Sequence, residues 1–224
     1  MNPGVALRVL LVVLVVLVSA PLPPDAAVEC VAVDDFSKAR VGDFPTDWKP
    51  RKDEGKEIYS VQEERGRRFL RAKARGQGIQ AGREHEWDLD TYPVLAWRWR
   101  PVEFPTGADE REPSTNDSVL AVYMLVPHSK VRGPQAVKYV WSERVPVGTW
   151  LESNGGLTQA RVLKNGTGKN GEWIVERVNV RDDFLKAFKT REVPKPAGIA
   201  VLTDSDDTKS TAVGDYADFQ VCRR

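Results

Sequence analysis

The stretch LAWRWR, residues 95–100, decides the fold. In a β-strand successive side chains point to opposite faces, so Trp97 and Trp99 share one face. Two tryptophans side by side predict the buried side of a sheet. Arg98 and Arg100 share the other face, where they cannot be buried without acidic partners. The stretch therefore predicts a strand with one core face and one face that is open to solvent or forms a polar groove.

Short β-rich runs like this one recur along the chain, bounded by Gly, Pro, Asn or Asp. Strands are predicted at residues 29–33, 57–62, 69–74, 79–81, 94–100, 118–126, 136–142, 156–163, 173–180, 198–203 and 216–222. Many short strands separated by turn signals favour an antiparallel sandwich or barrel. Residues 182–188 are the exception, because Phe184, Leu185 and Phe188 fall on one helical face behind an Asp cap. Residues 103–116 are polar and Pro-rich, which predicts one long surface loop.

Composition limits the partners that the chain can be expected to have. It has 224 residues, of which 41% are hydrophobic and 29% charged, and its formal net charge is +1. A chain of this length can bury a sizeable core as one domain. A nearly neutral chain gives no general attraction to nucleic acid or to an anionic membrane, so neither is expected as a partner.

The N-terminus has the layout of a secretory signal. Arg8 precedes the unbroken apolar run 9–18, and small residues follow it. This run is too short for a membrane span, which needs about 20 residues. Cleavage after Ala20 also fits, but the boundary we expect is a signal peptide over 1–27 and a single β-sandwich domain over 28–224. The expected location is then periplasmic or extracellular, without a stable membrane span after cleavage; an uncleaved anchor is the alternative.

The two cysteines, Cys30 and Cys222, lie at opposite ends of the mature chain. An even pair in an oxidising compartment favours a disulfide over free thiols. If the first and last strands pair antiparallel, both cysteines lie at the same end of the pair, within the reach of a bond. We therefore predict a Cys30–Cys222 disulfide. The alternative is that Cys30 lies in a disordered leader and Cys222 is a lone buried residue.

An acidic run follows the apolar strand at 198–203. Its sequence is Asp204-Ser205-Asp206-Asp207. Carboxylate oxygens of alternating Asp residues in a loop often hold Ca²⁺. The run lacks the Gly and distal Glu of an EF-hand loop, and Asp and Ser are also ordinary turn formers. A structural turn and a calcium site both remain open here, and no other cofactor is expected.

Familiar catalytic motifs give little support for an enzyme. Residues 166–171 match GxGxxG, but a strand rather than a helix is predicted after them, which favours a hairpin loop over a dinucleotide site. Glycosidic chemistry needs two carboxylates that face each other across a cleft. Asp117, Glu176, Asp204 and Asp206 are the possible members, and the sequence does not say which two converge.

An ordered series of motifs resembles the bacterial family catalogued as domain of unknown function 3047. The motifs are Asp34-Asp35-Phe36, Gly42-x-x-Pro45-x-x-Trp48, Tyr92-Pro93-x-Leu95-x-Trp97-Arg98-Trp99-Arg100, Asn116-Asp117, Tyr139-Val140-Trp141-Ser142, Trp173, Glu176-Arg177-x-Asn179-Val180-x-x-Asp183-Phe184, Gly198 to Asp206, and Tyr216-Ala217-Asp218-Phe219. The resemblance covers nearly all of the mature chain. It implies an exported β-sandwich similar to carbohydrate-binding jelly rolls, and it carries over no activity, substrate or catalytic residue.

Two positions depart from the pattern that this resemblance implies. Lys189 stands where a Gly is expected after the helix, and Ala121 stands where an Arg is common on the strand after Asp117. If that Arg belongs to a polar groove in the family, the groove of this protein is altered.

Taken together, the fold expected is an all-β, antiparallel sandwich of jelly-roll type with one short helix. The leading hypothesis for function is a non-catalytic module that binds a glycan or another polar ligand in a groove. The residues expected to line that groove are Arg98, Arg100, Asp117, Glu176, Asp204, Asp206 and Asp207. The alternatives are a glycoside hydrolase or lyase that uses the same groove, and a structural protein of the cell envelope in which these charges form buried salt bridges.

Overall fold

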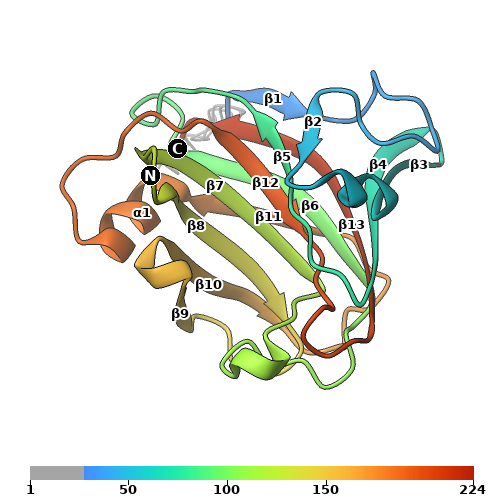
Figure 1. Cartoon of the computed structure of the whole chain (residues 1–224). Coiled ribbons are helices and arrows are strands. Elements are labelled where there is room, and N and C mark those ends of the chain that lie inside the picture. The colour runs from blue at the N-terminus through green and yellow to red at the C-terminus, as the bar shows by residue number, and fades with distance from the viewer. Residues whose placement is uncertain (1–27) are drawn as a thin grey trace, which may run out of the picture.

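The computed structural model describes residues 28–224, which form two β-sheets packed face to face and one α-helix (Figure 1). The strands are β1 (Cys30–Asp34), β2 (Trp48–Pro50), β3 (Tyr59–Glu64), β4 (Arg67–Arg75), β5 (Ala81–Glu84), β6 (Val94–Glu103), β7 (Leu120–Ser129), β8 (Gly133–Ser142), β9 (Trp150–Ser153), β10 (Thr158–Asn165), β11 (Ile174–Asn179), β12 (Gly198–Leu202) and β13 (Thr211–Cys222). The helix α1 is Val180–Phe188, and short 3-10 turns occupy Asp53–Glu57, Pro113–Thr115 and Asn154–Gly156.

The two sheets differ in size and order. The six-stranded sheet runs β11-β6-β13-β4-β3, with β1 paired to β13, and the seven-stranded sheet runs β2-β5-β12-β7-β8-β10-β9. Strand pairs are antiparallel except β8 and β10, which are parallel because the short β9 lies between them in the chain and returns alongside β10. The predicted antiparallel, jelly-roll-like sandwich is confirmed, with this one parallel pair.

The core lies between the two sheets, and the strand that decides the fold stands at its centre. Trp97 and Trp99 are buried and lie edge to face, with ring centroids 5.3 Å apart. They meet Tyr139 and Trp141 of β8, on the facing sheet, at 5.6 and 5.8 Å. The predicted core face of residues 95–100 is confirmed. Aromatic contacts of this kind add about 0.5–1.5 kcal/mol each to the burial of the rings.

The helix α1 closes one end of the core with its apolar face. Its N-cap is Asn179, whose side-chain oxygen accepts from the Asp182 amide at 3.0 Å, so the Asp cap predicted for this helix was wrong by one turn. The helix ends at Lys189, which is left-handed with φ 51°. Glycine adopts that conformation at least cost, which explains why Gly is expected at this position; nothing in the structure explains the Lys189 found there.

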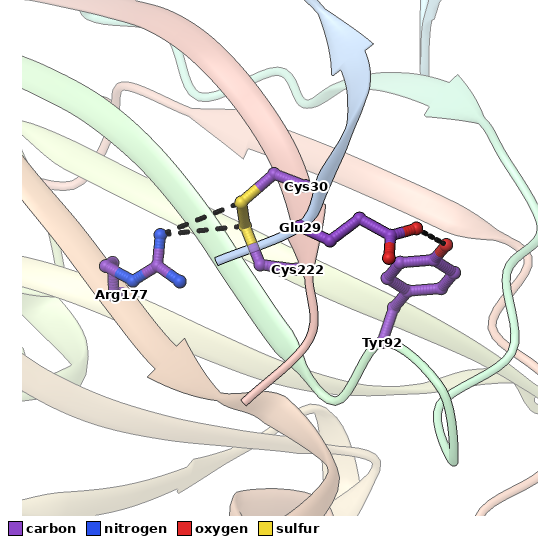
Figure 2. Close-up of a disulfide and its surroundings, with 5 residues drawn as sticks. All are labelled: Glu29, Cys30, Tyr92, Arg177 and Cys222. Atoms are coloured by element: carbon purple, nitrogen blue, oxygen red, sulfur yellow. Dashed lines mark hydrogen bonds between the residues drawn. A yellow bond between two sulfur atoms is a disulfide. The ribbon is translucent and has the colours of Figure 1, made fainter. Parts of the chain in front are cut away.

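The predicted disulfide joins the first and last strands (Figure 2). Strands β1 and β13 pair antiparallel, Cys30 lies directly opposite Cys222, and their Cα atoms are 4.0 Å apart. The guanidinium of Arg177, on β11, lies over the bond with Nη1 at 3.9 and 3.6 Å from the two sulfur atoms. Beside it, the Tyr92 hydroxyl donates to Glu29 at 3.0 Å. These contacts fix both ends of the described chain on one sheet.

Other expectations from the sequence have mixed outcomes. The short strands β2 and β9 were missed, and the strand expected at 79–81 begins at Ala81 instead. Residues 166–171 do not form a hairpin loop, because β10 and β11 belong to different sheets and the loop crosses between them. The predicted signal peptide, residues 1–27, lies outside the described residues. No helix within residues 28–224 is long and apolar enough to span a membrane.

Candidate functional site

The residues expected to line one groove lie in three separate places. Arg98 and Arg100 are on the outer face of the six-stranded sheet, opposite the core tryptophans of the same strand. Glu176 lies on the core side of that sheet. The acidic residues from 117 and from 204–207 meet in the loop that follows β12. The expectation of a single groove was wrong, because strand alternation puts the arginines and Glu176 on opposite faces.

The two arginines have the acidic partners that their half-buried positions require. Arg98 Nε lies 2.6 Å from Asp218 Oδ2, and Arg100 Nη2 lies 2.7 Å from Asp215 Oδ2. Asp215 is fully buried and also receives two hydrogen bonds from Arg71, at 2.7 and 2.9 Å. These arginines therefore belong to ion pairs that lie along the outer side of the sheet.

Glu176 is held between the sheets. It lies opposite Trp97 on the neighbouring strand, accepts from Trp99 Nε1 at 3.2 Å, and approaches Lys164 Nζ at 3.4 Å. Burial raises its pKa, against the opposing charge of Lys164. Lys164 is on β10 of the other sheet, so the pair bridges the two layers at their edge. Its surroundings are those of a structural contact.

Asp117 organises the acidic loop. Its side chain is fully buried and accepts from the amides of Asp207 and Thr208, at 3.1 and 2.8 Å, and from the Thr208 hydroxyl. Carboxylate oxygens of Asp117, Asp206 and Asp207 lie within 4.8 Å of one another, whereas Asp204 is not part of this trio. Such a cluster could hold a hard cation. Calcium binding at Asp204, Asp206 and Asp207 stays a prediction, and on geometry Asp117 replaces Asp204 in it.

Ionisable side chains gather on the outer face of the seven-stranded sheet. This face carries a second packing cluster, separate from the main core, composed of Ala121, Tyr123, Ala136, Val140, Ala160, Ala200 and Leu202. Within residues 28–224 no helix or strand packs against it, but its residues are nearly fully buried, and the loop 103–116 reaches this face, where Glu110 accepts from Ser142. Ala121, where the family resemblance favours Arg, is one of its residues.

Lys138 stands at the centre of this face, directly opposite Tyr123 on the neighbouring strand. Only 9% of Lys138 is exposed, and no carboxylate of the described chain forms an ion pair with it. Its Nζ lies 5.7 Å from the centre of the Tyr123 ring. Burial lowers the pKa of Lys138. The Tyr123 oxygen and the carboxyls of Asp204 and Glu110 raise it by more than this, so the net result is a pKa above the ordinary value. Lys138 is thus a buried cation without a direct counter-ion.

Two carboxyl groups lie near Lys138, joined through Ser118. The Ser118 hydroxyl donates to Glu110 at 3.1 Å, and its carbonyl accepts from the Asp204 amide at 2.9 Å. Glu110 also accepts from the Ser142 hydroxyl, and burial raises its pKa. We call Glu110, Tyr123, Lys138, Asp204 and Asp206 the outer-face cluster. Groups with perturbed pKa values that converge in this way mark candidate functional sites.

Asp204 is the most perturbed acid of the outer-face cluster. Burial, a hydrogen bond with Asp206 and the charges of Asp206 and Asp117 raise its pKa to about 8, against the opposing charge of Lys138. Its carboxylate packs against Gly78, where an added Cβ would lie 2.0 Å from Oδ1. Near neutral pH Asp204 is therefore largely protonated and can donate a hydrogen bond.

A pH dependence of stability follows from this pKa. The unfolded chain has an ordinary Asp pKa of 3.8, so stability from the protonated form is present below about pH 4 and is lost as pH rises toward 8. Asp204→Asn keeps the group neutral and is expected to flatten the fall of the unfolding free energy over that range. Urea unfolding at several pH values measures it. Asp53→Asn, on an exposed turn, is the matched control and should keep the wild-type slope; a wild-type slope in Asp204→Asn would contradict the assignment.

Sequence reasoning found Asp204 and Asp206 but missed Glu110, Tyr123 and Lys138. Glu110 lies within the polar loop 103–116, where nothing distinguishes it from its acidic neighbours. Lys138 did leave a signal. It is the one charged residue in the run AVKYVWS, on the face that alternates with Tyr139 and Trp141.

The search of curated proteins gave no match. The carbohydrate recognition domain of Emp47p matches with 12% identity and a TM-score of 0.41, over 90% of this chain and 99% of that one. The family 11 xylanase from Neocallimastix patriciarum matches with 12% identity and a TM-score of 0.40, over 87% and 99%. Both TM-scores are below 0.5, so neither likeness bears on function.

A family model covers most of the described chain. It matches residues 46–220, which include the core strand, the helix and the outer-face cluster. The match agrees with the ordered motifs found in the sequence. The chain therefore belongs to the family described as Protein of unknown function (DUF3047).

Proposed function

We propose that the protein is an exported module that binds a neutral, hydroxyl-rich glycan on the outer face of its seven-stranded sheet. The observation that carries this is Lys138, a cation that is nine-tenths buried, without a direct counter-ion, on a face against which no helix or strand of residues 28–224 packs. A buried charge of this kind costs several kcal/mol of stability, so it contributes nothing to the fold, and a role in binding accounts for its presence.

The chemistry of the outer-face cluster suits sugar hydroxyls. A hydroxyl both donates and accepts, and the cluster offers donors at Lys138 and at protonated Asp204 beside acceptors at Glu110 and Asp206. Export is supported by the apolar run at residues 9–18 and by the disulfide, which is typical of oxidising compartments.

The test replaces Lys138 with Met, which has similar volume and no charge. Wild type is expected to bind one or more of cellohexaose, xylohexaose and mannohexaose on a glycan array, and Lys138→Met to bind at least about tenfold more weakly. The same variant should melt at an equal or higher temperature, because a buried charge is removed. Lys130→Met, in the exposed β7–β8 turn, is the control. Equal binding by wild type and Lys138→Met, or no binding by wild type, would refute the proposal.

Hydrolysis of a glycosidic bond at the same place is the second candidate. It is favoured by one observation: Asp204, with a pKa of about 8, lies beside Asp206, so one carboxyl is protonated while another is available as base. Release of label from a labelled polysaccharide would distinguish this enzyme from a module that only binds. A structural protein of the cell envelope would show neither glycan binding nor turnover.

A further inference from the structure

A cavity on the opposite side of the molecule has a different chemistry. It lies on the outer face of the six-stranded sheet, has a volume of about 270 Å³, and is lined by Arg65, Arg67, Arg68, Arg98, Phe69 and Trp173, with Glu64 as its one acid. A neighbouring cavity of about 410 Å³ shares Arg67 and Arg68. In a chain of net charge +1, a lining with four arginines is a local concentration of positive charge.

Only some of the arginines that line this cavity form ion pairs within the described chain. Arg68 is anchored by Glu63 and by the carbonyls of Ser37 and Ala39, the latter two at 2.7 Å. Glu64 forms an ion pair with Arg100, with Oε2 at 3.1 Å from Nη1. By contrast, Arg65 and Arg67 are exposed and enter no ion pair within residues 28–224. Two cations therefore remain unpaired at the rim of the cavity.

The Arg98 guanidinium is held in place at the cavity wall. Its Cζ lies 5.0 Å from the centre of the Trp173 ring, and its Nε pairs with Asp218, which leaves the Nη atoms without a hydrogen bond within the described chain. Asp218 follows Ala217, which lies opposite Arg98, so in a regular strand its side chain would point into the core. A bulge and a left-handed φ of 54° turn it outward instead. Bulges commonly re-aim a side chain in this way next to functional sites.

We propose that this cavity binds an oxyanion, the carboxylate or sulfate group of an anionic glycan, and that it is independent of the glycan site on the other sheet. Arg98 and Arg67 present N–H donors, and guanidinium matches planar oxyanions with paired hydrogen bonds. Single-stranded nucleic acid fits less well. Phe69 and Trp173 contact each other edge to face at 5.5 Å, and guanidinium groups of Arg98 and Arg100 already lie over Trp173, so a stacking base would have to compete with them for the ring.

Calorimetry on the intact chain tests this with three probes: polygalacturonate oligosaccharides, heparin-derived sulfated oligosaccharides and neutral cellohexaose. One or both anionic glycans should bind, and the tighter one identifies the group. Arg67→Ala should raise its Kd at least about tenfold, with an unchanged melting temperature. Arg98→Lys, which keeps the charge but loses the planar fork, should weaken binding as well.

Two controls separate this site from general charge and from the other face. Arg51→Ala removes an exposed arginine elsewhere and should leave the Kd unchanged, as should Lys138→Met. Binding of neither anionic glycan by wild type, unchanged Kd in both Arg67→Ala and Arg98→Lys, or tighter binding of a single-stranded oligothymidylate would overturn the proposal.

Discussion

Reduction of the Cys30–Cys222 disulfide is expected to lower the free energy of unfolding by about 5 kcal/mol, near the upper end for such bonds. The two cysteines are 192 residues apart, so the bond closes a loop that holds almost all of the described chain. In the chain-entropy model a longer closed loop costs the unfolded state more freedom. Urea unfolding with and without a reductant measures the difference.

The double variant Cys30→Ser, Cys222→Ser is the control for reduction. It should start at the lowered stability and show no further change when reductant is added. Mass spectrometry of the unreduced protein should detect the linked terminal peptides. Two free, alkylatable thiols, or a loss below about 1 kcal/mol on reduction, would contradict this account of how the termini are held.

Asp215→Ala is expected to cost about 3–5 kcal/mol of stability, because it leaves guanidinium groups in a half-buried layer without their shared acid. Asp215 is fully buried and pairs with both Arg71 and Arg100. Arg100 is itself only 12% exposed, so water cannot fully replace the lost partner.

Glu64 supplies a matched comparison, since it pairs with the same Arg100 but from a side chain that is 51% exposed. Glu64→Gln should cost less than about 1 kcal/mol, as exposed ion pairs usually do. Thermal and urea unfolding of both variants measures the contrast. Equal, small losses in the two variants would show that the network does not stabilise the sheet, and would leave ligand binding as the main reason for these charges.

The sequence predicted the fold well because the signals that set it are local. Alternation in residues 95–100 is enough to place Trp97 and Trp99 in the core, and the helix at 180–188 shows its apolar face over two turns. The strands β2 and β9 were missed because they have three and four residues and hold no alternating pattern. Their place in the sheet comes from tertiary pairing.

The candidate site was predicted only in part because it is built from residues far apart in the chain. Asp204 and Asp206 stood out as an acidic run, whereas Glu110 reaches the same place through hydroxyls of Ser118 and Ser142. Convergence of this kind depends on how β7, β8 and β12 lie side by side. Glu176 was misplaced because both faces of its strand IVERVN mix apolar and polar side chains, and only the pairing with β6 shows that it faces inward.

Hydrogen exchange with mass spectrometry tests the proposed glycan site most directly. The intact chain is compared with and without the neutral hexasaccharides. We predict slower exchange in peptides from the start of β7, from β8 and from the loop at 203–210, in wild type and not in Lys138→Met. Unchanged exchange in all these peptides, or protection confined to the β3–β4 hairpin and β11 on the opposite sheet, would contradict the proposal that the outer face of the seven-stranded sheet binds the glycan.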